Sequence, residues 1–180
     1  MGQMRKFMLI FNYLSFQICW VALTVYDNIG LLIFFMFLNI HFILIYYLDK
    51  GPAIKLELIT LLIVCLIGTT VDLLLTDYKV YNFLGLELLP HWYMALWVLF
   101  ASTLNHCFYS FLHLPAIVVS FLAALFVPLA YTGLTVLTPK FSIAEPQTLS
   151  LLAICTLWFL LLPLFTKVTL LLRTAILNEQ

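Results

Sequence analysis

Asp72 is the residue whose type and position most strongly suggest chemistry. It lies within Leu58–Thr76, a run of 19 residues that contains no other charged side chain. An ionisable group inside such an apolar run is costly to bury, and such groups usually have a functional role. We therefore take Asp72 as the first candidate for an acid, a base or a proton-binding group.

Two further carboxylates, Asp27 and Asp77, are expected at the same end of the predicted helices as Asp72. Close carboxylates tend to share a proton, which is the basis of acid–base catalysis by carboxylate pairs. These three residues are the catalytic candidates of a proton-handling or hydrolytic site. The alternative is that Asp72 caps or hydrogen-bonds a neighbouring helix while it reaches water.

A second group of polar side chains is expected deeper in the predicted helices. Its members are Gln17, Asn39, His41, Asn105 and His106. Hydrogen bonds between helices are the expected role, and ligand binding is the alternative. A metal requires three or four convergent ligands, and only two histidines lie near this depth, so we expect no metal and no cofactor. Along the membrane normal, about 15 Å separates His106 from Asp72, which argues against a direct pair.

The composition indicates that lipid is the solvent for most of this chain. Apolar residues make up 65% of the 180 residues, charged residues make up 9%, and the mean hydropathy is +1.14. Soluble domains carry about 25% charged residues. The formal net charge is zero, so no basic surface indicates a nucleic-acid partner. We expect one integral membrane domain over residues 1–180.

Uncharged runs predict six transmembrane helices, because about 20 residues cross a bilayer. Residues 88–139 form a run of 52 residues without Lys, Arg, Asp or Glu, which is too long for one helix. Pro115 divides this run, since proline disfavours a helix at the preceding residue and suits a helix start. The predicted spans are at about 7–26, 28–48, 57–76, 91–112, 115–137 and 147–170. The predicted fold class is an all-α, polytopic transmembrane bundle.

The positions of Lys and Arg predict that both ends of the chain lie in the cytoplasm. In that orientation the inner segments carry Arg5, Lys6, Lys50, Lys55, Lys167 and Arg173. The outer loops carry only Lys79 and Lys140. Because cytoplasmic loops are enriched in positive charge, this distribution favours the N-in, C-in orientation.

Several short motifs in the chain resemble a known family. They are Phe16–Trp20 (FQICW), Gly68–Leu74 (GTTVDLL), Pro90–Trp97 (PHWYMALW), Phe100–His106 (FASTLNH) and Val127–Tyr131 (VPLAY). With these motifs, and over about residues 11–163, the chain resembles an uncharacterised bacterial inner-membrane family, domain of unknown function 2878. The positions that match the family pattern are Asp72, Trp97, Asn105, His106, Pro128 and Tyr131.

The resemblance implies a small multi-pass protein of the bacterial inner membrane, and such proteins are often encoded beside enzymes that modify fatty acids. The leading hypothesis is a non-catalytic component that assists lipid modification, with membrane lipid and a lipid-modifying enzyme or other membrane protein as partners. A second hypothesis is an enzyme that acts on lipid or lipoprotein, with Asp72 as its acid or base. A third is a small proton-coupled transporter, in which Asp72 couples protons and His41 and His106 line the path.

Overall fold

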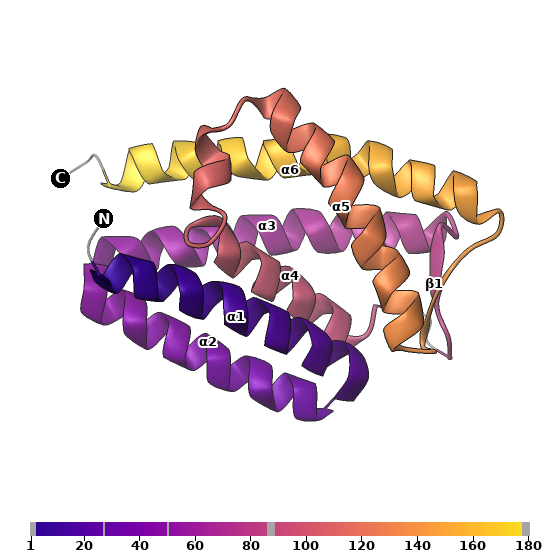
Figure 1. Ribbon diagram of the computed structural model, residues 1–180, viewed down its shortest axis with the longest axis horizontal. Coiled ribbons are helices and arrows are strands. Elements are labelled where there is room, and N and C mark those ends of the chain that lie inside the picture. The colour runs from indigo at the N-terminus through magenta and orange to yellow at the C-terminus, as the bar shows by residue number, and fades with distance from the viewer. Residues whose placement is uncertain (1–2, 27, 50, 86–88, 178–180) are drawn as a thin grey trace.

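Helices dominate the computed structural model, which describes residues 3–26, 28–49, 51–85 and 89–177. The elements in chain order are α1 (Gln3–Tyr26), α2 (Asn28–Asp49), α3 (Gly51–Asp77), β1 (Tyr81–Phe83), α4 (His91–Leu104), the 3-10 helix η1 (Tyr109–His113), α5 (Ala116–Leu137), β2 (Phe141–Ile143) and α6 (Gln147–Leu177). The predicted all-α helical bundle is confirmed. α1 begins and α6 ends at the same end of the molecule (Figure 1).

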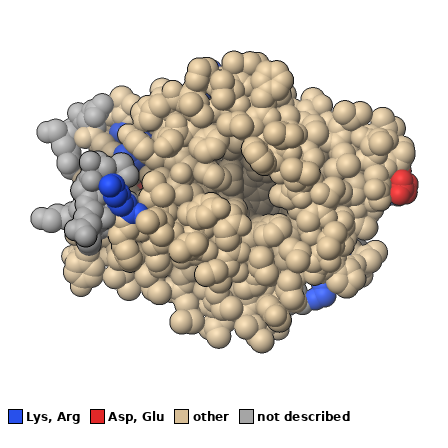
Figure 2. Space-filling view, viewed as in Figure 1, with Lys and Arg blue, Asp and Glu red and all other residues tan. Residues whose placement is uncertain are grey.

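Within the described ranges, five helices are long and apolar enough to cross a membrane. They are α1, α2, α3, α5 and α6. Many large apolar side chains on these helices are exposed, and the charged side chains visible in Figure 2 lie only toward the ends of the molecule. This surface suits lipid rather than water, so the chain is a membrane protein.

The fourth predicted span, residues 91–112, is wrong in its length. α4 contains only 14 residues and ends at Leu104, so it is about 21 Å long and shorter than a hydrocarbon core. Asn12 of α1 stabilises this early end: its amide donates to the Ser102 carbonyl at 3.1 Å, and its side-chain oxygen accepts from the Cys107 amide at 3.5 Å. These bonds satisfy backbone groups that a helix end leaves free.

Other helix boundaries agree with the predictions or extend beyond them. Leu114 is extended (φ −78°, ψ 151°) and α5 begins at Ala116, so the predicted break at Pro115 is confirmed. α3 begins at Gly51 rather than at about residue 57, and α6 continues to Leu177 rather than to about residue 170.

A two-stranded antiparallel sheet closes the end of the bundle opposite the start of α1 (Figure 1). β1 and β2 pair in the register Tyr81 with Ile143 and Phe83 with Phe141, and these four side chains are buried. Successive strand residues point to opposite faces, so the sheet directs one aromatic face into the bundle. These strands were not predicted from the sequence.

Gly30 allows α1 and α2 to approach closely. A Cβ atom at this position would overlap the backbone carbonyl of Ala22 and the Cα atom of Leu23. Backbone atoms cannot move aside as the end of a flexible side chain can. Small residues play this role widely in membrane helix pairs, because they let two backbones come together.

We predict that Gly30→Ala lowers the free energy of unfolding by about 1–3 kcal/mol, the usual cost of overpacking. Gly133→Ala is the matched control, because its Cβ would meet the Trp20 ring at an ordinary 3.4 Å. Thermal or detergent-induced unfolding of the full chain measures both. Equal stability of the two variants would contradict the close approach at Gly30.

Candidate functional site

The carboxylate of Asp72 is buried and held by hydrogen bonds from three aromatic side chains. Tyr81 donates to Oδ1 at 2.5 Å, and the indole nitrogen of Trp97 donates to Oδ2. Tyr131 also donates to Oδ1 at 3.5 Å. Asp72 is only 1% exposed, so these donors take the place of water around its oxygens.

Two more aromatic residues extend this network. Tyr93 donates to Tyr131 at 3.3 Å and to Tyr81 at 3.5 Å, and Trp158 donates to Tyr131 at 3.5 Å. Burial raises the pKa of the Tyr81 phenol, so this hydroxyl stays protonated and acts as a donor. We call this group the aspartate–aromatic cluster: Asp72, Tyr81, Tyr93, Trp97, Tyr131 and Trp158. It joins α3, β1, α4, α5 and α6.

Gly68 makes room for the indole of Trp97. It lies one helical turn before Asp72 on α3, and a Cβ there would overlap the Trp97 ring. Trp97 also stacks on Trp158, with ring centroids 5.4 Å apart and planes within 2°. The glycine therefore lets the indole lie along α3, where its N–H reaches the carboxylate of Asp72.

The structure does not bring Asp72 and Asp77 together. Asp77 lies five positions further along α3, about 140° around the helix axis, and its side chain is exposed. The predicted pair with Asp77 is therefore not formed. Asp27 lies outside the described residues. The alternative prediction, in which Asp72 bonds to a neighbouring helix, fits the bond from Trp97 of α4, but the carboxylate is shielded from water.

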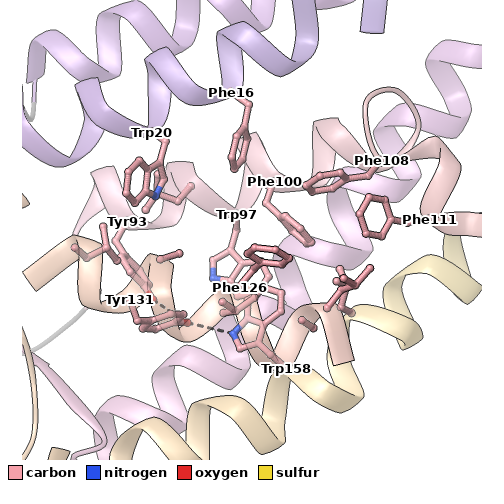
Figure 3. Close-up of a pocket in the computed structure, with 17 residues that line it drawn as sticks. Phe16, Trp20, Tyr93, Trp97, Phe100, Phe108, Phe111, Phe126, Tyr131 and Trp158 are labelled. Carbon is pink, nitrogen blue, oxygen red and sulfur yellow. Dashed lines mark hydrogen bonds between the residues drawn. The ribbon is translucent and has the colours of Figure 1, made fainter. Parts of the chain in front are cut away.

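An apolar cavity of about 360 Å³ lies beside the aspartate–aromatic cluster. It lies between α1, α4, α5 and α6, and its walls include Phe16, Trp20, Phe100 and Phe126 (Figure 3). Figure 2 shows a hollow in the middle of the uncharged face. Tyr93, Trp97, Tyr131 and Trp158 belong both to the cavity wall and to the aspartate–aromatic cluster, whereas Asp72 and Tyr81 do not line the cavity.

Pro128, another position of the family pattern, lies inside α5 near this wall. Proline has no N–H, so it leaves the carbonyl four residues earlier without its helical partner. That carbonyl belongs to Ala124, and the thiol of Cys155 on α6 lies 3.4 Å from it. The proline thus frees the Ala124 carbonyl for a contact between α5 and α6, about two turns before Tyr131.

A second polar cluster surrounds Glu57 near the start of α3. His41 Nε2 lies 2.9 Å from Glu57 Oε1, and Asn105 Nδ2 donates to Glu57 Oε2 at 3.0 Å. His106 Nε2 lies 3.5 Å from Glu57 Oε2. Arg173 donates to Asn105 Oδ1 at 3.3 Å. We call His41, Glu57, Asn105 and His106 the Glu57 cluster.

This cluster contains three of the five polar residues that were expected to lie deep in the bundle. Gln17 and Asn39 do not join it, because both are exposed on the outer faces of α1 and α2. Asn39 instead donates to the Phe35 carbonyl of its own helix at 2.7 Å. Of the five, the structure brings together only His41, Asn105 and His106.

Glu57 itself was missed, because it stands at the edge of an uncharged run and resembles an ordinary flanking charge. The spacing of Glu57 from Asp72 and from the apolar positions of the same helix could have revealed it. The buried positions among the described side chains of α3 are Leu56, Glu57, Thr60, Leu61, Val64, Gly68 and Asp72, which follow the 3.6-residue period of one helix face. Because Glu57 lies on the same face of the helix as Asp72, its side chain is expected to point into the bundle too.

The two clusters are separate sites. Asp72 follows Glu57 by 15 positions on α3, which corresponds to about 22 Å along the helix axis. The buried side chains of this stretch of α3 include Leu61 and Val64, and Leu99 and Ala101 of α4 are buried as well. Among the described side chains, no chain of direct hydrogen bonds joins the two clusters.

Comparison with known proteins gives one match. A family model described as "Protein of unknown function (DUF2878)" matches residues 9–164. No curated protein and no solved structure matches the chain.

We predict that Asp72→Ala lowers the free energy of unfolding by at least about 2 kcal/mol, because the two closest donors, Tyr81 and Trp97, are buried and lose their acceptor at about 1–3 kcal/mol each. Asp72→Asn should recover part of this loss, because its amide oxygen can accept from Trp97 and its NH₂ can donate to the Tyr81 oxygen. Tryptophan fluorescence during unfolding of the full chain measures the stabilities of the wild type, Asp72→Asn and Asp72→Ala, which should decrease in that order.

Asp77→Ala serves as the control and should change stability by no more than about 0.5 kcal/mol, because the Asp77 side chain is exposed. If Asp72→Ala were as stable as Asp77→Ala, the hydrogen bonds at Asp72 would not hold the cluster together.

Proposed function

Since the chain belongs to the DUF2878 family, whose function is unknown, we propose a function from its own geometry. The protein binds the hydrocarbon chain of a membrane lipid in the cavity between α1, α4, α5 and α6. It thereby serves as an accessory component of lipid or fatty-acid modification. The observation that carries this proposal is the open aromatic cavity on an uncharged face of the bundle.

The size and lining of the cavity suit an acyl chain. Its volume of about 360 Å³ lies at the lower end of the roughly 300–1,000 Å³ that is typical of small-molecule sites. The lining is almost entirely aromatic and aliphatic. Because the mouth lies on a face without visible charge, a lipid chain can enter sideways from the bilayer without crossing water.

Polar groups at one end of the cavity supply a place for the oxygen atoms of the lipid. The hydroxyls of Tyr93 and Tyr131 and the indole nitrogen of Trp158 meet there (Figure 3). Tyrosine and tryptophan combine an apolar body with a polar tip, which suits the junction between an acyl chain and its carboxyl or ester group. Asp72 fixes Tyr81, Trp97 and Tyr131 in place, so this end is preorganised.

The geometry favours an accessory role over catalysis by Asp72. Both carboxylate oxygens already accept hydrogen bonds, and the residue does not line the cavity. The polar atoms that the described lining residues present are hydroxyl and indole groups, which bind rather than act as a strong base or nucleophile. In this proposal a partner enzyme performs the reaction, and this protein retains or presents the lipid.

The same proposal places the protein in the bacterial inner membrane, with both ends in the cytoplasm. Lys6, Lys55, Lys167 and Arg173 lie toward the bundle end where α1 begins and α6 ends. Lys79 and Lys140 lie toward the opposite end, beside the two strands. This asymmetry supports the orientation, because positive residues are retained on the cytoplasmic side.

We predict that Ala130→Trp, which fills the cavity, reduces lipid binding about tenfold, or about 1.4 kcal/mol. The full chain in vesicles that contain a photoreactive fatty acid is irradiated, and labelled residues are located by mass spectrometry. In the wild type, label is expected on Phe100 and Trp158 inside the cavity.

Leu129→Trp is the matched control, because this exposed neighbour on α5 does not line the cavity. It should keep the labelling of the wild type. Label confined to lipid-facing side chains such as Leu152, or equal cavity labelling in both variants, would remove the proposal.

We predict that a fluorescent protein fused after residue 180 is fluorescent in bacterial cells, and that alkaline phosphatase fused there is inactive, because both results require a cytoplasmic C-terminus. Fusion of either reporter into the loop at Lys140 should reverse the outcome. An active phosphatase at the C-terminus would contradict the N-in, C-in orientation.

A further inference from the structure

The Glu57 cluster directs three metal-binding side chains toward one point. We propose that His41, Glu57 and His106 bind a divalent transition-metal ion of the zinc type. One ligand atom from each residue can be chosen so that all three lie within 4.8 Å of one another. The three residues come from α2, α3 and the turn after α4, so an ion here would bridge three separate segments.

The spacing of the ligand atoms fits such an ion. Zinc lies about 2.0–2.2 Å from histidine nitrogen and carboxylate oxygen, and two ligands at these distances are about 3.4 Å apart in a tetrahedral site. The observed separations from the Glu57 oxygens are 2.9 Å for His41 Nε2 and 3.5 Å for His106 Nε2. Only small side-chain movements are needed to close the site.

The histidine rings are oriented for joint binding. Their centroids are 4.9 Å apart and their planes are perpendicular, at 89°. Both rings present Nε2 to the same carboxylate. In a stacked pair the lone pairs of the two nitrogens would run parallel. In this edge-to-face arrangement the lone pairs of the two Nε2 atoms can point to one ion.

One buried ligand atom lacks a hydrogen-bond partner. His106 Nε2 has none among the described residues, although it is buried. An unsatisfied buried polar atom is rare and usually has an explanation such as an ion or a water. A metal ion would use the lone pair of His106 Nε2 and would also balance the buried charge of Glu57, which is 1% exposed.

Asn105 and Arg173 support the carboxylate from outside the site. Asn105 donates to Glu57 Oε2 and accepts from Arg173, so the guanidinium bonds to the amide oxygen of Asn105. Partners of this type orient metal ligands in many proteins. Each carboxylate oxygen has two lone pairs, so Glu57 can accept from Asn105 and still bind an ion.

The His106 ring is the most exposed part of the site. His41 is fully buried, whereas the side chain of His106 is 17% exposed. Three protein ligands leave a fourth position, which water or substrate takes in many zinc sites. A metal was not expected from the sequence, because only two histidines lie near this depth, and Glu57 supplies the third ligand.

Cobalt binding tests this proposal. The full chain is purified in detergent, stripped with EDTA and titrated with Co²⁺, whose visible absorption reports four- or five-coordinate nitrogen and oxygen ligation. We predict one Co²⁺ ion per chain, displaced by Zn²⁺. Glu57→Gln and His106→Gln should each weaken binding by at least about 100-fold, because even substitution of outer partners of metal ligands costs 10–100-fold.

The double variant His91→Gln with His113→Gln is the control, because it removes both exposed histidines and should bind as the wild type does. Zn²⁺ should raise the unfolding temperature of the wild type and the control but not of Glu57→Gln. If the ligand variants do not fold, X-ray absorption of the wild type with Zn²⁺ decides, since it must show two histidine nitrogens. No bound ion in the wild type, or wild-type affinity in Glu57→Gln, would overturn the proposal.

Discussion

A carboxylate that is removed from water must have its lone pairs satisfied, and the end of the bundle that carries the two strands is arranged around that requirement. Asp72 accepts hydrogen bonds from Tyr81, Trp97 and Tyr131, which come from three different elements. Burial of Asp72 therefore requires that β1 and α4 pack against α3, and that α5 brings Tyr131 within reach of the carboxylate. The two-stranded sheet is part of the same constraint, because it delivers Tyr81 to the carboxylate.

The same face of α3 carries the Glu57 cluster at its other end. One stripe of α3 runs from Glu57 through Val64 and Gly68 to Asp72. Its two ends take hydrogen-bond partners from α2, α4 and α5, and α6 contributes indirectly through Arg173, which bonds to Asn105. Apolar packing between the ends keeps the two centres apart. Lipid cannot satisfy a polar group, so each centre is closed by its own hydrogen bonds.

The hydrogen bonds around Asp72 also fix part of the cavity wall. On one side of its wall, Trp97 and Tyr131 are bonded to Asp72, and Phe100 and Trp158 pack against Trp97. A wall of fixed rings can keep an open space that flexible aliphatic side chains would fill. In this way the structural role of Asp72 and the lipid-binding role that we propose for the cavity belong to one arrangement.

The sequence by itself determined the apolar helices, the break at Pro115 and the place of Asp72 inside an apolar run, because composition acts locally along the chain. It did not determine the early end of α4, which depends on Asn12 of α1, or the strand pairing that brings in Tyr81. Glu57 lies on the same face of α3 as Asp72. However, a charged residue at the edge of an uncharged run can face either water or the protein interior. Only the tertiary structure shows that Glu57 faces the interior. His41 and Asn105 are distant from Glu57 in the sequence, and they supply the hydrogen-bond partners that make its burial possible.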